Sequence, residues 1–320
     1  MANKNSNLHS AKTAKNDEFY TQLTDIEKEM MYYKDFFKGK VVLCNCNDMV
    51  HTNFAKYFSL NFEHLGLKKL ICTAYKIDGV HGKVCIYEGD KNGNLIPDIE
   101  EWEQHLLNGD GSFDSEECIE FLKECDVVVT NPAFSLFRRF VKTLFDYDKK
   151  FLIIGNMNAI TYKEIFPYIK NNQLWLGVSL NATKCSFLVS NEYDGTNTFI
   201  DYDGKKKAKV NNAVWFTNID NKKRNTPLDL YKKYTSEEYP QYDNYNAIEV
   251  SKVCDIPMDY DGVMGVPITF LDKYCPTQFE IIGIMSGAKG EPFTNGNDNR
   301  AKFYVNNKGV YARILIKRIA

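Results

Sequence analysis

The sequence Thr130-Asn131-Pro132-Ala133-Phe134 combines residue types that could act on an aromatic amine. The lone pair of such an amine is delocalised into its ring, so the nitrogen is a weak nucleophile. The side-chain oxygen of Asn131 and the carbonyl of Pro132 could accept hydrogen bonds from both amine N–H groups, which favours a pyramidal nitrogen. Phe134 offers a flat face on which an extruded base could stack. This chemistry requires neither a metal ion nor a strong base.

The same residues also suit a simpler role. Asn-Pro is a common pair in turns that end a strand. Pro132 fixes its own φ and restricts Asn131 to extended geometry, so the loop is rigid under either interpretation. Its position after the apolar run 126–129 and before a helical pattern is what favours an active edge of a sheet.

The surrounding pattern predicts an α/β fold, because apolar strands alternate with amphipathic helices. Sheets of this kind bind ligands at the carboxyl ends of their strands. We therefore expect the site in the loops that follow Cys44, Tyr75, Thr130 and Ile154. The predicted strands cover 40–44, 70–75, 83–87, 126–130, 150–154, 175–178, 186–189 and 214–217.

Two helices are expected to begin with the Thr-x-x-Glu pattern of a capping box, at Thr24 with Glu27 and at Thr161 with Glu164. The first of these should end at Gly39. The pattern further predicts a helix over 115–124, a helix start at Ser135 and a Gly/Asp/Asn-rich loop over 88–114. The lysine-rich run 205–209 could contact phosphate or could simply be a hairpin tip.

Composition narrows the protein class. The nine cysteines form no CxxC pair and no His/Cys cluster, which indicates buried thiols in a reducing compartment and no metal site. No stretch approaches the ~20 apolar residues of a membrane span, and the polar N-terminus lacks an apolar leader core. These features predict a cytoplasmic protein with no membrane partner.

Charge is distributed unevenly along the chain. From residue 201 onward there are 18 Lys+Arg against 15 Asp+Glu, which leaves 22 against 27 in residues 1–200. This mild basic excess gives weak support for phosphate contact by the C-terminal part. We expect a flexible arm over 1–16, a catalytic domain over 17–218 and a target-recognition region over 219–320.

Several segments together resemble the EcoRI-type adenine-specific DNA methyltransferases. They occur in the family's order and span nearly the whole chain. The matching segments are 17–22 (DEFYTQ), 41–46 (VVLCNC), 126–132 (DVVVTNP), 134–138 (FSLFR), 149–154 (KKFLII), 175–178 (WLGV) and 262–271 (GVMGVPITFL).

The resemblance implies a Rossmann-like S-adenosylmethionine-dependent methyltransferase sheet with helices on both faces and a smaller C-terminal module. It also implies transfer of a methyl group to N6 of a flipped-out adenine in double-stranded DNA. Asn131, Pro132 and Phe134 match the family's catalytic loop. Position 133 is alanine where the family usually has proline, so both acceptors are kept but some loop rigidity is lost.

Cofactor residues follow from the same resemblance. Phe19, Tyr20 and Thr21 resemble the segment that contacts the methionine end of S-adenosyl-L-methionine, although they could instead pack the entry of the first helix. The glycine-free loop that contains Asn45 and Asp48 takes the place of the usual glycine-rich turn. For the carboxylate and the ring that flank the cofactor we favour Asp110 and Phe113; Asp78, Asp90 and Asp114 are alternatives.

Other functions remain open from the sequence. The Asn-Pro loop also occurs in methyltransferases that act on RNA adenine or on protein glutamine, and a non-catalytic DNA-binding relative would share most of the pattern. For the enzyme we expect a monomer in a restriction-modification, orphan or phage context. It would work alongside a cognate endonuclease without forming a complex.

Overall fold

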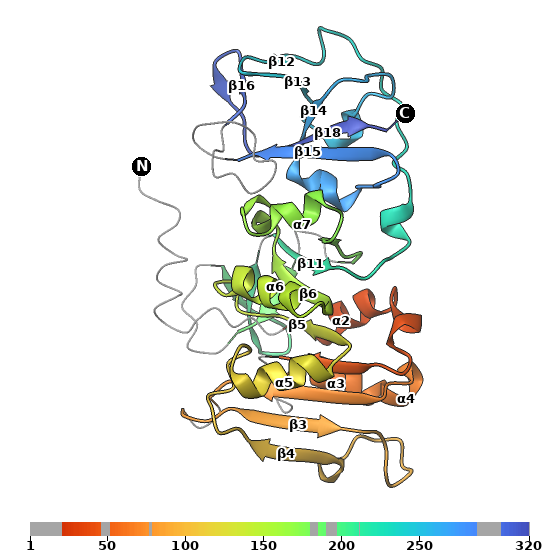
Figure 1. Ribbon diagram of the computed structural model, residues 1–320, viewed down its shortest axis with the longest axis vertical. Coiled ribbons are helices and arrows are strands. Elements are labelled where there is room, and N and C mark those ends of the chain that lie inside the picture. The colour runs from red at the N-terminus through yellow and green to blue at the C-terminus, as the bar shows by residue number, and fades with distance from the viewer. Residues whose placement is uncertain are drawn as a thin grey trace. The chain divides into compact units, whose positions relative to one another are not determined.

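A computed structural model describes residues 21–45, 52–76, 79–179, 185–189, 197–210, 212–286 and 302–319. The chain divides into two compact units (Figure 1). The first comprises Met1–Met157 and Gly177–Ile219, and the second comprises Asn158–Leu176 and Asp220–Ala320. The α/β fold class expected from the sequence is confirmed, with a mixed sheet flanked by helices. No helix among the described residues is long and apolar enough to cross a membrane.

The central sheet of the first unit carries four parallel strands at its middle. Its strands are ordered β4-β3-β2-β1-β5-β6-β11. The strands β2, β1, β5 and β6 run parallel, whereas β3, β4 and β11 are antiparallel to their neighbours. Their bounds are β1 Val41–Cys44, β2 Lys69–Ala74, β3 Lys83–Tyr87, β4 Trp102–Leu106, β5 Val127–Thr130, β6 Lys150–Asn156 and β11 Ala213–Thr217.

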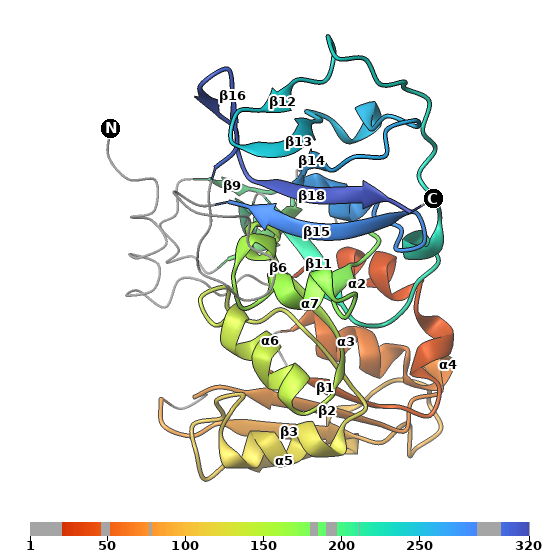
Figure 2. The same ribbon diagram turned by 45° about the horizontal axis from the view of Figure 1, so that its top comes forward.

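Helices cover both faces of this sheet, as Figures 1 and 2 show. On one face Trp215 of β11 packs edge-on against Phe54; on the other, the next residue, Phe216, packs against Phe137. Successive strand residues point to opposite faces, so these two contacts assign the helices to their sides. The first face carries α2 Leu23–Met30, α3 Asn53–Leu60 and α4 Phe62–Leu65, and the second carries α5 Glu116–Glu124 and α6 Phe137–Asp146.

Burial of apolar strands explains why the sequence pattern located the sheet. Every residue of β1, β5 and β11 is buried, as expected for strands covered on both faces. The residues Ile26 and Met30 of α2, and Tyr33 and Phe37 after it, recur at helical spacing and are at most 2% exposed. Hydrophobic burial on two faces is therefore the main stabilising term of the first unit.

Both expected capping boxes are wrong. The helix α2 begins one residue before Thr24, with Gln22 at the N-cap and no side-chain cap, and it ends at Met30 well before Gly39. Thr161 lies at the end of the 3-10 helix Met157–Thr161, and α7 Phe166–Lys170 begins with Ile165 at its N-cap. In both cases tertiary packing of the apolar residues sets the helix start, because capping contributes only about 1 kcal/mol.

Three other boundaries differ from the sequence expectation. The stretch 88–114 is not all loop, because β4 (Trp102–Leu106) lies within it and pairs with β3. The helix expected from Ser135 begins at Phe137. Residues 205–209 are not a hairpin tip: β10 Lys206–Val210 is the middle strand of a three-stranded sheet between β8 Cys185–Leu188 and β9 Thr198–Ile200.

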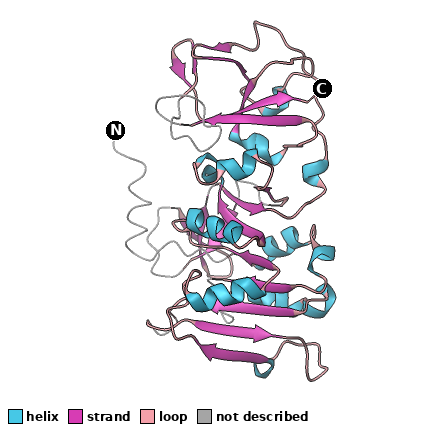
Figure 3. Ribbon diagram, in the orientation of Figure 1, coloured by secondary structure: helices cyan, strands magenta, loops and turns pink. Residues whose placement is uncertain are grey.

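The second unit is built around a five-stranded sheet, seen in magenta in Figure 3. Its strand order is β12-β13-β14-β18-β15. The bounds are β12 Gln241–Tyr242, β13 Tyr245–Glu249, β14 Met264–Pro267, β15 Phe279–Met285 and β18 Arg313–Arg318. The unit also contains a hairpin of β16 Tyr304–Val305 and β17 Lys308–Gly309, and the short strand β7 Trp175–Leu176.

A buried ion pair joins three strands of this second sheet. The guanidinium of Arg313 donates to both carboxylate oxygens of Glu249, with contacts of 2.6 to 3.0 Å. The Tyr242 hydroxyl donates to the same carboxylate, and its ring stacks on Phe303 at 4.0 Å between centroids. A bidentate and further hydrogen-bonded pair of this kind specifies strand register, because removing one partner leaves a buried charge.

Candidate active site

The Asn-Pro loop leaves the sheet at the carboxyl end of β5, as expected. The Thr130 hydroxyl donates to the backbone carbonyl of Asn45 over 2.5 Å, which joins the ends of the neighbouring strands β5 and β1. Asn131 is half-buried and Pro132 is buried. The Leu136 amide donates to the Ala133 carbonyl over 2.9 Å, so a tight turn follows and leads into α6. No described N–H or O–H group donates to the Pro132 carbonyl.

Thr21 connects the expected cofactor segment to the Asn-Pro loop. The side-chain nitrogen of Asn131 donates to the Thr21 hydroxyl over 3.2 Å. The side-chain nitrogen of Asn53 donates to the Thr21 carbonyl over 2.8 Å. Thr21 is only 4% exposed. Residues 110 positions apart in the chain are thus held together by hydrogen bonds between neutral groups.

Phe134 lies at the edge of the core on the α2–α4 side. Its ring is partly buried and packs against the hydrophobic cluster that includes Ile26 and Phe54. A partly exposed ring beside Asn131 is what a stacking role requires. That role stays a prediction.

Asp110 lies at the carboxyl end of β2, the strand next to β1. Its carbonyl accepts from the Lys76 amide over 2.9 Å, and its carboxylate accepts from the Ser112 amide over 2.9 Å. The close approach depends on two glycines, since a Cβ on Gly111 would lie 2.4 Å from the Ala74 carbonyl and one on Gly82 would lie 2.4 Å from the Gly111 Cα. Asp110, Asn45 and Asn131 therefore end or adjoin three neighbouring strands at one edge.

Phe113 is placed differently from the half-buried residues of this edge. It is 3% exposed and packs edge-on against Phe140 of α6 at 4.9 Å, with the Arg139 guanidinium 5.1 Å from its ring centroid. Arg139 also pairs with Asp114. Burial raises the pKa of Asp114, but the Ser112 hydroxyl and Arg139 outweigh it and set the pKa below its usual value. Phe113 therefore anchors the Asp110 loop on α6, and its contact with a cofactor stays a prediction.

The remaining expected residues, Phe19, Tyr20 and Asp48, lie outside the described residues, as does the alternative Asp78. The carboxylates of Asp90 and Asp114 are engaged in local contacts, since Asp90 accepts from the backbone amides of Asn92, Gly93 and Leu95. Among the described residues no cluster of His, Cys, Asp or Glu could hold a metal ion.

Sequence reasoning missed two residues that organise this edge. Asn53 follows the N-cap Thr52 of α3 and binds Thr21. Glu29 is fully buried, and its carboxylate accepts from the amides of Val178 and Ser179 and from the Ser179 hydroxyl over 2.7 to 3.1 Å. Glu29 lies three residues after Ile26 and four before Tyr33, which are both buried. A charged residue at helical spacing from buried apolar residues is the signal that would have revealed it.

Comparison with known proteins identifies the family. The family described as adenine-specific methyltransferase EcoRI matches residues 7–319. The chain is 47% identical to the Type II methyltransferase M.EcoRI of Escherichia coli, over 97% of this chain and 95% of that protein. It is 40% identical to M.MpnI of Mycoplasma pneumoniae and 37% identical to M.MgeORF184P of Mycoplasma genitalium, both Type II methyltransferases, over 97% of this chain and 98% of each relative. No solved structure matches. The chain therefore belongs to the EcoRI family of adenine-specific methyltransferases.

Proposed function

We propose that the protein transfers a methyl group from S-adenosyl-L-methionine to N6 of an adenine extruded from double-stranded DNA, at a specific site. The observation that carries the proposal is the hydrogen bond between Asn131 and Thr21. It supports the proposal because it joins Asn131, and with it the adjoining Pro132, to the segment expected to bind the methyl donor. We expect the enzyme to act as a monomer in the cytoplasm, without forming a complex with any cognate endonuclease.

The Asn131 amide has its nitrogen toward the Thr21 hydroxyl. Because its nitrogen donates to Thr21, the other amide atom, Oδ1, is the one that would accept from the adenine amine. The Pro132 carbonyl would accept the second N–H. Both bonds draw the N–H groups to one side of the nitrogen and direct its lone pair away from the ring. They strengthen as positive charge develops on the nitrogen, so they stabilise the transition state more than the ground state.

The edge of the sheet fits the proposed methyl donor. Asn45 and Asp110 end or adjoin neighbouring strands, where α/β sheets bind nucleotides, and Thr21 is bonded to Asn131 at the same edge. Asp110 would bind the ribose hydroxyls or the adenine amine, and Thr21 would lie at the methionine end. When bound, the cofactor supplies an electrophilic methyl group on a sulfonium. The residues at this edge would bind and orient the two reactants, and the proton released from the amine would pass to water.

A labelling experiment tests the proposal. The protein is incubated with methyl-labelled S-adenosylmethionine and, separately, with adenine-unmethylated genomic DNA, total RNA or a cell protein extract. Labelled N6-methyladenine in the DNA alone is the expected result. Label in RNA or in glutamine would replace the proposal with one of those substrates, and cofactor binding with no transfer would indicate a non-catalytic relative.

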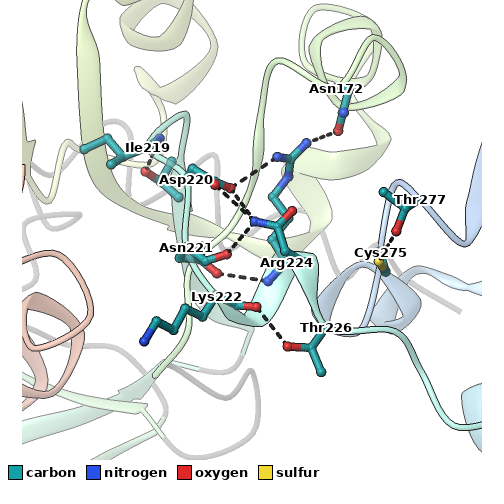
Figure 4. A network of polar contacts seen from close by, with 11 residues as sticks. Asn172, Ile219, Asp220, Asn221, Lys222, Arg224, Thr226, Cys275 and Thr277 are labelled. Carbon is teal, nitrogen blue, oxygen red and sulfur yellow. Dashed lines mark hydrogen bonds and ion pairs between the residues drawn. The ribbon is translucent and has the colours of Figure 1, made fainter.

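We propose further that the second unit recognises the DNA sequence. One of its polar networks, drawn in Figure 4, fixes the segment 220–226, which begins the longer of its two stretches of chain. The Arg224 guanidinium stacks on Trp175 at 3.8 Å and contacts Asp220 and Asn172. The side-chain nitrogen of Asn225 donates to the Asp220 carboxylate over 3.0 Å. A segment fixed in this way is a rigid support for side chains that read base edges.

Sequencing of methylated adenines in DNA treated with the enzyme would give the recognised site. Exchanging residues 158–176 and 220–320, which form the second unit, for those of a relative with a different site should transfer the new specificity and leave cofactor affinity unchanged. A chimaera that folds, methylates and keeps the original site would show that recognition belongs to the first unit.

A further inference from the structure

The three-stranded sheet β8-β10-β9 of the first unit has two unlike faces. On one face Phe187 and Ala208 are buried in the core, at 1% and 2% exposure. The opposite face carries Phe199, Lys207 and Lys209, because residues paired across an antiparallel ladder share a face and neighbours along a strand alternate. This second face, together with the β9–β10 turn at 201–205, is here termed the hairpin surface.

Hydrogen bonds tie the hairpin surface to the active edge. The Gln22 side-chain nitrogen donates to the Ser186 carbonyl over 2.7 Å, and the Lys207 ammonium donates to the Gln22 side-chain oxygen over 3.0 Å. Gln22 directly follows Thr21, which holds Asn131. The strand β10 also leads into Ala213, the first residue of β11, which pairs with Asn156 at the carboxyl end of β6. The hairpin surface therefore lies at the edge of the sheet that carries the catalytic loop.

The hairpin surface carries side chains of the types that bind nucleic acid in other proteins. Lys207 is committed to Asp201 and Gln22 and serves as support. Lys205 and Lys209 are exposed, and among the described residues no carboxylate forms an ion pair with either. The Lys209 ammonium lies 5.6 Å from the Phe199 ring, and Tyr202 at the tip is 93% exposed. Exposed cations interleaved with exposed aromatic rings suit a phosphate backbone with sugars or unstacked bases beside it.

A second basic segment, 222–224, has fewer cations available for an anionic partner. In the second unit, Lys223 pairs with Asp272 at 2.6 Å. Arg224 stacks on Trp175 and pairs with Asp220. The cations of this segment are mostly neutralised within the protein. Of these two lysine-rich segments, the one that contains Lys205 and Lys209 is therefore the better candidate to bind an anionic partner.

We propose that the hairpin surface binds the DNA backbone next to the extruded adenine, through Lys205 and Lys209, with Tyr202 packed against sugars or bases. This inference rests on the proposed function and adds a sequence-independent DNA contact made by the first unit. Such a contact positions the duplex over the active edge whatever sequence the second unit reads.

The test compares two double variants. Lys205→Gln with Lys209→Gln removes the proposed contacts, and Lys68→Gln with Lys150→Gln removes two exposed lysines at the opposite, amino edge of the sheet. Binding of a labelled mixed-sequence duplex of about 30 base pairs is measured between about 0.05 and 0.2 M salt. The first variant should bind about 10-fold more weakly and lower the salt slope of log K by about 2. The second should match the unaltered protein.

Tyr202 gives an independent measurement, because at 93% exposure its replacement leaves the core untouched. Tyr202→Ala should weaken duplex binding by about 3-fold or more, while Tyr202→Phe should retain it, since stacking needs only the ring. Cofactor binding and thermal midpoint should stay unchanged in every variant, which separates loss of DNA contact from loss of fold.

The possible results distinguish failure of the hairpin inference from failure of the proposed function. If the unaltered protein methylates DNA but the hairpin variants keep its affinity and salt slope, the hairpin inference is wrong and the proposed function stands. If the unaltered protein neither binds the duplex nor methylates DNA, both fail. If single-stranded RNA of the same length competes better and depends on the same lysines, the partner of this surface is RNA.

Discussion

The two edges of the central sheet are stabilised by different kinds of contact. At the carboxyl edge the loops are joined by neutral side chains: Thr130 to Asn45, and Asn131 and Asn53 to Thr21. At the amino edge charged side chains bind backbone groups at or just before the starts of the strands. The Asp126 carboxylate accepts from the Val41 amide over 2.8 Å, and the Lys149 ammonium donates to the carbonyls of Lys123 and Cys125 over 2.8 to 2.9 Å.

This difference suggests a division of labour. Charged side chains that bind backbone groups at the amino edge stabilise the fold and face no substrate. Neutral hydrogen bonds at the carboxyl edge fix the orientation of Asn131 without placing a fixed charge beside a reaction that develops positive charge on nitrogen. Substitutions at the carboxyl edge should therefore change catalysis more than stability, and substitutions at the amino edge should do the reverse.

The largest effect is expected from Asn131→Ala. It removes one of the two acceptors for the adenine amine, so kcat should fall by a factor on the order of 1,000. Cofactor affinity, measured by calorimetry, should stay within about 3-fold because Asn131 does not hold the cofactor in this account. Transfer that persists at more than a tenth of the original rate would remove Asn131 from the catalytic role.

Thr21→Val should have the next largest effect. The change keeps the side-chain shape but removes the hydroxyl that accepts from Asn131. We expect kcat to fall about 10-fold, with recovery in Thr21→Ser, which restores an acceptor. A change in cofactor affinity with kcat unaffected would instead make Thr21 a cofactor ligand that does not position Asn131.

The amino edge gives the opposite expectation. Asp126→Ala removes the carboxylate that accepts from the Val41 amide, so the free energy of unfolding in urea should fall by about 1 kcal/mol. The rate of methyl transfer should stay within about 2-fold, because a single hydrogen bond at this edge supports no catalytic group. Comparable losses in rate and in stability would show that the amino edge does not serve stability alone.

Ala133→Pro should have the smallest effect. It restores the residue that the family usually carries and restricts Pro132 to extended geometry. Among the described residues none accepts a hydrogen bond from the Ala133 amide, so the substitution removes no such bond there. We expect a gain in thermal midpoint of a few degrees and a rate within about 3-fold. A large loss of activity would mean that alanine provides space the reaction needs.

Sequence reasoning located the central strands and the Asn-Pro loop after β5 because both depend on local signals. Runs such as Val127-Val128-Val129 are typical of strands buried on two faces, and Pro132 restricts its own loop. It failed at both capping boxes, where packing of Ile26 and Phe166 overrode a weaker local preference. The partners of Thr21 and Glu29 lie 32 to 150 residues away, and no single-sequence pattern shows contacts of that range.

The most direct test of the central claim is a crystal structure of the protein with its DNA site and a non-reactive analogue of the methyl donor. The account predicts an adenine outside the helix, with N6 at about 3 Å from both Asn131 Oδ1 and the Pro132 carbonyl, and the donor sulfur on the side of the lone pair. An extruded adenine whose amine bonds to other groups, or a DNA bound with every base stacked while the donor site is filled, would contradict it.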